Sequence, residues 1–325
     1  MRPMEEIIEA IHRAETVAVV SHVNPDGDTI GSALALKLGL DKLGKRTALF
    51  CQDRVPDRIA FLRDAGAYRR PENAGDGRYD LLICVDVADE HRMGRCQCLT
   101  ERCARSIQID HHGTNPNYAE MNCVDAKAPA TALVIHELLE RLSVPMDADI
   151  AACLYVAIST DTGNFAFAST NPETFRVMAE LMEAGLPLSE LNRRLYRQRE
   201  IPQVLLTQRC LSSLTFHHGG DITTMTLSKQ DFTDCGAMAE HADTLVNYGL
   251  DILGVRMTAL LRETSVPGEV KLSLRAVEPA SVSGVAKHFG GGGHAQASGA
   301  TVKGSLDEWL PRCVEAMAKA LETGE

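Results

Sequence analysis

The sequence lacks an uninterrupted apolar run of the roughly 20 residues that a membrane-spanning helix needs. It also lacks a secretion signal, because residues 1–14 mix acidic and basic side chains with isoleucines at helical spacing and contain no apolar core. These two absences exclude a membrane-spanning protein and a secreted one. We therefore expect a cytoplasmic protein that has no membrane partner.

Basic residues are comparatively scarce in this chain. Of its 325 residues, 33 are lysine or arginine and 44 are aspartate or glutamate, which gives a formal net charge of −11. Proteins that coat long nucleic acids neutralise many phosphates with basic side chains, so this balance argues against such a partner. A short anionic substrate held in a local site is compatible with it.

The rest of the composition is that of an ordinary globular protein, with 45% hydrophobic and 24% charged residues. The length leaves room for two domains. Ten cysteines, several of them in apolar runs, fit a reducing compartment better than a disulfide framework. Cys96, Cys98 and Cys103 lie close enough in sequence to suggest zinc, but a fourth ligand at suitable spacing is missing.

Short apolar strands alternate with helices in the first part of the chain. The predicted strands are 16–20, 47–51, 81–85 and 106–109, and the first helix of this pattern is 29–43. The run 81–85 has no polar alternation, which indicates burial on both faces and hence a mostly parallel sheet flanked by helices. Further helices are predicted at 130–142, 149–159, 173–184, 188–196 and 203–214.

The composition changes near residue 215, where a second and smaller α/β domain is predicted. Its expected strands are 221–227, 253–262 and 270–275, and its expected helices are 237–247 and 307–321. We assign 1–190 to the first domain, 191–214 to a helical connector and 215–325 to the second domain.

Candidate metal ligands gather at the ends of the predicted elements in the first domain, where α/β sheets bind their ligands. Imidazoles and carboxylates without thiolates suit manganese or magnesium better than structural zinc. The set is too large for one ion and about right for two, which together can clamp a phosphate ester during hydrolysis. It comprises His22, Asp26, Asp28, Asp86, His111, His112 and Asp161.

Each member of this set, taken alone, has a simpler interpretation. Asp28 is readily explained as a helix N-cap with Asp26 in a turn, and Asp86 as a loop cap. Either histidine of the pair His111 and His112 would more often be an ordinary surface residue. The coincidence of all of them at element ends favours the metal-site interpretation.

The segment Asp110-His111-His112 resembles the signature of the DHH phosphoesterase superfamily. His22-x-x-x-Asp26-x-Asp28, Val85-Asp86 and Asp161-Thr162-Gly163 match the other motifs of the superfamily in order. The glycine run 290–293 with His294, which follows the segment 271–275, resembles the associated DHHA1 domain. Length and motif details are most similar to the bacterial group of bifunctional oligoribonucleases (nanoRNases) and pAp phosphatases.

The resemblance implies a two-manganese site, with magnesium or cobalt as substitutes. His22, Asp26 and Asp86 would hold one ion, while Asp28, Asp86, His111 and Asp161 would hold the other, so that Asp86 bridges them. Asp110 would orient the histidines, and His112 would stabilise charge on the phosphate or assist the leaving oxygen. Asp86, Asp110 and His112 are therefore the expected catalytic residues.

The second domain is expected to bind the substrate. Glycines let backbone N–H groups approach an anion closely, although four of them are equally a flexible loop, and an arginine can grip a phosphate bidentately. By the resemblance this domain recognises the terminal nucleotide, and the reaction takes place in the cleft between the domains. Ala276-Val277 departs from the Ser-Lys that relatives often have there. The predicted substrate-binding residues are Arg275, Gly291, Gly292, Gly293 and His294.

Together these features predict a manganese-dependent hydrolase that degrades short oligoribonucleotides to mononucleotides and converts pAp to AMP and phosphate. The nearest alternative in the same superfamily is a phosphodiesterase of linear pApA or of cyclic dinucleotides. A catalytically silent nucleotide-binding regulator is a third interpretation, which the presence of every expected ligand disfavours. A homodimer is compatible with this architecture.

Overall fold

The computed structural model describes residues 3–75 and 77–323. The chain divides into two units, Met1–Gln198 and Arg199–Glu325, and each unit has hydrophobic clusters of its own. Within the described residues, no helix combines the length and the apolar character that crossing a lipid bilayer requires.

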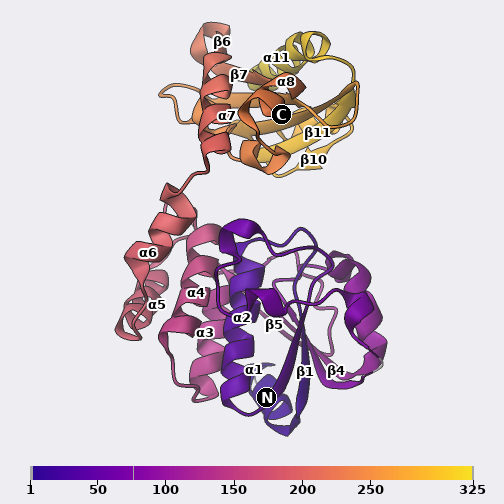
Figure 1. The fold of residues 1–325 in the computed structure, drawn as a ribbon, viewed down its shortest axis with the longest axis vertical. Coiled ribbons are helices and arrows are strands. Elements are labelled where there is room, and N and C mark those ends of the chain that lie inside the picture. Colours follow the sequence, from indigo (N-terminus) through magenta and orange to yellow (C-terminus); the bar gives the residue numbers. More distant parts are fainter. Residues whose placement is uncertain (1–2, 76, 324–325) are drawn as a thin grey trace. The chain divides into compact units, whose positions relative to one another are not determined.

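The first unit is built on a five-stranded parallel sheet (Figure 1). The predicted strands are present with small shifts of their ends, and the parallel arrangement is confirmed. The fifth strand escaped prediction because it has four residues, of which only Met121 is buried. The strand order is β2 (Arg46–Phe50), β1 (Thr16–Val20), β3 (Tyr79–Val85), β4 (Cys103–Asp110) and β5 (Met121–Val124).

Helices cover one face of this sheet in two layers. The inner layer is α1 (Pro3–Arg13), α2 (Gly27–Lys42) and α3 (Thr131–Arg141), and the outer layer is α4 (Ala148–Asp161) and α5 (Pro172–Glu183). The opposite face packs on η4 (Glu90–Arg102), a 3₁₀ segment that buries Met93, Cys96 and Leu99 against the strands. The sheet is therefore buried on both faces as predicted, although the second cover is not a regular α-helix.

A glycine allows α2 and α4 to pack closely. A Cβ atom on Gly31 would lie 2.4 Å from the backbone oxygen of Cys153 and 2.9 Å from the Cβ of Ala157. The helix could not keep its position with any side chain there, because a backbone oxygen cannot move aside as a flexible side chain can. This packing matters for the site described below, since α2 and α4 each carry a candidate ligand.

The chain leaves the first unit through α6 (Leu188–Asn192) and the π-helical turn η5 (Arg193–Arg197). The helix predicted at 188–196 is thus irregular in its second half. The Tyr196 hydroxyl lies 2.6 Å from Ser159 Oγ on α4, which ties this turn to the first unit. The next helix, α7 (Ile201–Ser212), contributes Leu206 and Cys210 to a core cluster of the second unit.

The second unit contains a six-stranded mixed sheet, in which β7 and β8 are parallel and the other pairs antiparallel. Helices α10 (Ser283–His288) and α11 (Leu306–Thr323) share a core cluster with one face, and α7, α8 (Lys229–Cys235) and the short α9 (Asn247–Leu250) lie on the other side. The strand order is β10 (Gly292–Gly293), β11 (Ala297–Lys303), β9 (Glu269–Ala276), β8 (Met257–Glu263), β7 (Ile222–Leu227) and β6 (Thr215–His217).

Several elements of this unit differ from the prediction: the short elements β6, α8, α9 and β10 were not predicted, and neither was β11, while one predicted helix is replaced. The helix predicted at 237–247 is replaced by a 3₁₀ turn at Ala239–Ala242, where the Arg262 side chain donates to the Ala239 carbonyl. Strand β11 was not predicted, since Ala297-Ser298-Gly299-Ala300 has little intrinsic strand preference. Its pairing with residues 269–275 of β9 stabilises it instead.

We predict that Gly31→Ala destabilises the protein even though alanine favours helix formation by about 1 kcal/mol over glycine. The clash with Cys153 should cost about 1–3 kcal/mol beyond that gain and lower the thermal midpoint by about 2–4 °C per kcal/mol. Differential scanning calorimetry measures this directly. Gly66→Ala is the matched control, because no atom lies within 4 Å of its added Cβ. Equal midpoints for the two variants would contradict the close packing.

Candidate metal centre

The candidate ligands of the first unit lie at the carboxyl edge of the parallel sheet. His22 follows β1, Asp86 follows β3, and Asp110 is the last residue of β4, directly before His111. Strand β1 lies between β2 and β3, so the chain order reverses at this point of the sheet. Sheets of this kind bind ligands at such a reversal, outside the carboxyl ends of the strands.

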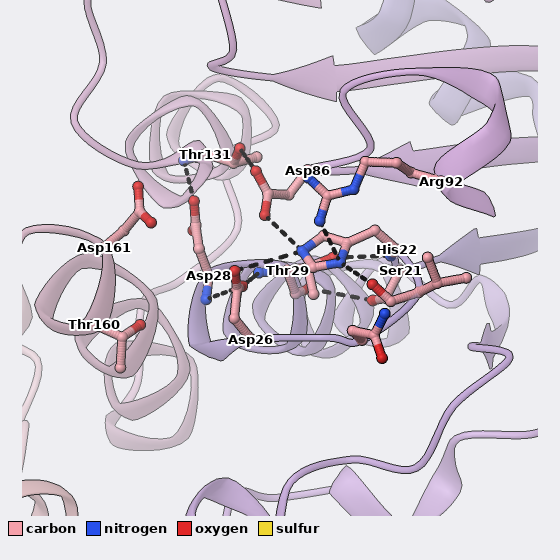
Figure 2. A network of polar contacts seen from close by, with 12 residues as sticks. Ser21, His22, Asp26, Asp28, Thr29, Asp86, Arg92, Thr131, Thr160 and Asp161 are labelled. Atoms are coloured by element: carbon pink, nitrogen blue, oxygen red, sulfur yellow. Dashed lines mark hydrogen bonds and ion pairs between the residues drawn. The ribbon is translucent and has the colours of Figure 1, made fainter. Parts of the chain in front are cut away.

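Asp26 has two roles in the loop between β1 and α2. Its Oδ1 caps the helix, because it accepts hydrogen bonds from the N–H groups of Asp28 at 3.1 Å and Thr29 at 3.2 Å. Its Oδ2 lies 3.6 Å from His22 Nε2. The cap therefore falls on Asp26 and not on Asp28, the residue for which the sequence suggested it, and it still leaves one carboxylate oxygen directed toward the histidine (Figure 2).

Asp28 lies in the first turn of α2 and is 1% exposed. Its Oδ2 accepts a hydrogen bond of 2.6 Å from the Thr131 N–H, and its Oδ1 accepts from the Ala132 N–H at 3.2 Å and from Ser32 Oγ at 2.9 Å. The N-cap of α3 is Ala130, which has no side chain to satisfy these N–H groups. A carboxylate from another helix thus caps α3.

Two histidines present the same nitrogen to these carboxylates. His22 Nδ1 lies 2.8 Å from the Val23 carbonyl, and His111 Nδ1 lies 3.1 Å from the Ala128 carbonyl. A carbonyl can only accept, so each Nδ1 carries a proton, and in the neutral ring each Nε2 keeps a lone pair that can bind a cation. Backbone carbonyls commonly fix metal-binding histidines in this way.

Asp86 faces both histidines with different oxygens. Its Oδ2 lies 3.5 Å from His22 Nε2, and its Oδ1 lies 3.7 Å from His111 Nε2. The Thr131 hydroxyl donates to Oδ1 at 2.8 Å. Asp86 adopts a left-handed conformation with φ of 60°, which aspartate tolerates better than most residues. It is the residue that joins the two halves of the cluster.

The second half of the cluster contains His111, Asp28 and Asp161. The His111 Nε2 atom lies 3.4 Å from Asp161 Oδ2 and 3.8 Å from Asp28 Oδ2. Asp161 is the last residue of α4, so the α2–α4 packing fixes its distance from Asp28. The structure therefore brings together all seven predicted ligands, in three overlapping groups: His22, Asp26 and Asp86; Asp28, His111 and Asp161; and Asp86, His111 and His112.

His112 differs from His22 and His111 in the partner of its Nδ1 atom. Its Nδ1 lies 2.8 Å from Asp110 Oδ1, and the side chain of Asn115 donates to the other oxygen of Asp110. This hydrogen bond raises the pKa of His112. Asp110 was expected to orient both histidines, but it contacts only the His112 ring, since Ala128 holds His111. His112 is 34% exposed at its side chain and has no hydrogen bond recorded at Nε2 within the described residues.

Electrostatic repulsion shapes the protonation of the cluster. Burial and the nearby charges of Asp86 and Asp161 raise the pKa of Asp28 well above its usual value. Burial, Asp86 and Asp26 raise the pKa of Asp161 to about 6. Burial lowers the pKa of His22, but Asp26 and Asp86 outweigh that effect and raise it to about 9. Such crowded acids favour the binding of a cation, which would displace these protons.

The geometry fits divalent cations. Nitrogen–oxygen distances of 3.4–3.8 Å in the cluster are too long for hydrogen bonds. Donor atoms about 2.1–2.2 Å from a common cation lie roughly 3.0–3.5 Å apart, which is close to these values. The donors are oxygen and imidazole nitrogen, which suit manganese. Among the described residues the candidate ligand groups include no cysteine, so the zinc interpretation of Cys96, Cys98 and Cys103 finds no support.

Several side chains that support the site were not identified from the sequence. Thr131 binds both Asp28 and Asp86, Asn115 fixes Asp110, and Ser32 donates to Asp28. Arg92 reaches the cluster from η4, with Nη2 3.0 Å from His22 Nδ1. Threonine at the first position of a helix was a visible signal for Thr131. Ser32 and Asn115 lie only four and five residues from the carboxylates that they bind. Arg92 is 70 residues from His22, so no local pattern could reveal that contact.

The glycine run of the second unit is ordered by its own sheet. Gly292 and Gly293 form β10 and pair with Gly299 and Ser298 of β11. A Cβ atom on Gly291 would lie 2.1 Å from the Gly299 carbonyl, and one on Gly293 would lie 2.6 Å from the Ala297 carbonyl. These two glycines are therefore required for close strand packing, which differs from the flexible-loop interpretation. Of the three glycines predicted to bind the substrate, Gly292 faces open space, where an anion could approach its backbone.

Arg275 and His294 lie at the same end of this sheet. Arg275 on β9 is opposite Ala297 on β11, whose carbonyl accepts from the His294 N–H at 2.9 Å. The guanidinium of Arg275 donates to the Leu274 carbonyl at 2.9 Å and forms no ion pair within the described residues. Burial lowers its pKa. A partly buried cation without a carboxylate partner is a suitable site for an anion.

Family models match both units. A model described as the DHH family, N-terminal domain, matches residues 16–158, and a model of the DHHA1 domain matches residues 225–323. All of the ligand positions except Asp161 fall within the first match, and Arg275 and His294 fall within the second.

Curated proteins and solved structures resemble the whole chain. The bifunctional oligoribonuclease and PAP phosphatase NrnA of Thermus thermophilus is 36% identical and covers 99% of this chain and 94% of its own length. The protein of the same name from Bacillus subtilis is 25% identical, with 91% and 92% coverage. An exopolyphosphatase-related protein from Bacteroides fragilis superposes with a TM-score of 0.89 at 25% identity, covering 99% and 96%. The structure of exonuclease RecJ bound to manganese superposes with a TM-score of 0.53 at 14% identity, over 99% of this chain and 95% of that one, and thus shares the fold.

We predict that Asp161→Asn stabilises the protein when divalent cations are removed with EDTA. The folded-state pKa of Asp161 is raised from 3.8 to about 6, so its ionised carboxylate weakens the fold as pH rises from about 4 to 6 and beyond. At pH 8 the variant should gain about 1 kcal/mol, or about 2–4 °C in thermal midpoint. At pH 4 the gain should disappear.

Manganese provides the matching control for this prediction. It should raise the midpoint of the wild type more than that of Asp161→Asn, because the variant has lost a charged ligand. An EDTA-treated variant that is less stable than wild type at pH 8 would show that Asp161 is held by attraction and not crowded by like charges.

Proposed function

The chain belongs to the DHH–DHHA1 family of phosphoesterases, together with the oligoribonuclease and PAP phosphatase of Thermus thermophilus, and we propose that it shares that protein's activities. It would hydrolyse short oligoribonucleotides to mononucleotides and pAp to AMP and phosphate. The observation that carries the proposal is the position of Asp86, whose two oxygens face two separate histidine–carboxylate groups.

We assign these two groups to two manganese ions. His22 and Asp26 would hold the first, while Asp28, His111 and Asp161 would hold the second, and Asp86 would bridge them. When bound, two such cations supply positive charge to a phosphate ester and acidify a water molecule. Magnesium or cobalt would fit the same oxygen and nitrogen donors.

The protein contributes orientation and proton transfer. Val23 and Ala128 keep the protons of His22 and His111 on Nδ1, so that both Nε2 atoms remain available. His112 is held through Nδ1 by Asp110, which favours its protonated form. Its half-exposed Nε2 is therefore suited to give a proton to the leaving oxygen of the ester.

The second unit would recognise the terminal nucleotide. The Arg275 guanidinium and the exposed His294 offer hydrogen-bond donors for a phosphate, and the backbone of Gly292 is accessible beside them. Gly291 and Gly293 would act indirectly, by allowing β10 to lie against β11. The acidic chain offers a long strand little attraction to its backbone, so short substrates are favoured.

We predict that, with manganese, catalytic efficiency is highest for RNAs of about two to five nucleotides and falls at least about tenfold for a strand of about 24. The enzyme should also accept pAp. A panel of these substrates, with linear pApA and a cyclic dinucleotide added, separates the proposed activities by gel electrophoresis and chromatography. Equal efficiency on the long strand would exclude the short-substrate proposal, and a preference for the cyclic dinucleotide would replace it.

The control for this panel is Asp86→Asn, which should retain the fold but lose several orders of magnitude in turnover on every substrate. EDTA should abolish the activity of the wild type, and manganese should restore it more fully than calcium, which prefers more oxygen ligands and looser geometry.

We further predict that Arg275→Ala lowers the efficiency on dinucleotides and pAp by about 10²-fold but affects bis-p-nitrophenyl phosphate little. That ester has no terminal nucleotide phosphate to bind. Arg256→Ala is the matched control in the same unit, because Arg256 lies directly before β8 and forms an exposed ion pair with Asp221. Similar losses on both kinds of substrate would show that Arg275 supports the fold or the reaction centre.

A further inference from the structure

Arg92 is a cation inside the cluster of candidate ligands. Its side chain comes from η4 and extends over Asp86 toward His22, on the side opposite Asp161 in Figure 2. It is half-buried. Within the described residues its guanidinium forms no ion pair with any carboxylate, although four acidic ligands lie in the same cluster.

The one recorded side-chain contact of Arg92 does not use the guanidinium fully. Arg92 Nη2 lies 3.0 Å from His22 Nδ1. However, His22 Nδ1 also lies 2.8 Å from the Val23 carbonyl. If Nδ1 carries the proton for Val23, it has no lone pair with which to accept from Arg92. The tautomer that leaves Nε2 available for a cation therefore leaves Arg92 without an acceptor at this position.

Backbone contacts hold Arg92 in place independently of its side chain. Its N–H donates to Asp89 Oδ1 at 3.1 Å, and its carbonyl accepts from the Val23 N–H at 2.8 Å. These contacts tie η4 to the loop that carries the His22 and Asp26 ligands. A fixed backbone with an unsatisfied guanidinium is the arrangement expected of an arginine that awaits an anion.

The field of Arg92 also reaches His112. Its positive charge acts to lower the pKa of that histidine, against the larger effect of Asp110. His112 Nδ1 is 3.7 Å from Asp86 Oδ1, and Figure 2 draws the end of the Arg92 side chain beside Asp86. An anion bound beside His112 would therefore lie within the electrostatic field of Arg92.

We propose that Arg92 binds a non-bridging oxygen of the scissile phosphate and favours phosphate monoesters over diesters. The inference rests on the proposed function and identifies within it a residue that sets substrate preference. A monoester carries close to one more negative charge than a diester near neutral pH, because its second ionisation has a pKa near 6. A charged donor aimed at that extra charge contributes more to the 3′-phosphate of pAp than to an internucleotide linkage.

The test compares Arg92→Gln with wild type on pAp and on a diadenosine dinucleotide at saturating manganese. The variant should lose about 10²–10³-fold in kcat/KM on pAp and about tenfold on the dinucleotide. Arg92→Lys, which keeps the charge but not the forked geometry, should lose less on pAp than Arg92→Gln does. Arg95→Gln is the matched control, because Arg95 lies three residues away on η4 and pairs with Glu72 at the surface.

Binding of inorganic phosphate to the manganese-loaded protein gives a second readout that does not require turnover. Isothermal titration calorimetry should show phosphate binding weakened about tenfold or more in Arg92→Gln, with an unchanged manganese content. Equal losses on both substrates, unaltered phosphate affinity, or a loss of manganese would each overturn the proposal. The last result would mean that Arg92 positions His22 instead. A wild type that binds phosphate but cleaves neither substrate would refute the proposed function and leave the role of Arg92 in phosphate binding standing.

Discussion

The burial of several carboxylates in one place is the constraint on which the first unit depends. Asp28 and Asp86 are 1% and 2% exposed, and their negative charges repel each other. Buried carboxylates of this kind need hydrogen-bond donors to compensate them. The compensating donors are the N–H groups at the start of α3 and the hydroxyl of Thr131. The first turn of a helix has unpaired N–H groups to offer. The beginnings of α2 and α3 therefore have to meet at the carboxyl edge of the sheet.

The sequence was sufficient to locate this edge and most of what lies on it. Apolar runs identify parallel strands, and a polar residue directly after such a run must lie at the edge where strand ends meet, as Asp86 does after β3. The same logic placed His22 and His111. The parallel arrangement of the sheet also follows from these apolar runs, because strands that are apolar throughout must be buried on both faces.

Local sequence could not reveal interactions that depend on distant segments. The N-cap of α2 is Asp26, two residues before the Asp28 that the sequence suggested. Asp26 has the extended backbone of a cap, while the Asp28 carboxylate accepts hydrogen bonds from residues more than a hundred positions away. The sequence predicted that the glycine run binds an anion. In the structure Gly291 and Gly293 are needed for close packing against β11, a strand that the sequence did not predict. Arg92 was invisible for the same reason, because only folding brings η4 to the loop after β1.

Tyr196 completes the first unit near its end. Its hydroxyl meets Ser159, two residues before Asp161, and the aliphatic and aromatic clusters on either side of residue 198 are separate. The chain therefore consists of two units with separate cores, and the boundary between them lies just beyond Tyr196. If the second unit recognises the terminal nucleotide, as proposed, recombination just beyond Tyr196 would change substrate preference. The carboxylate cluster would not have to be rebuilt, because all of its residues precede this point.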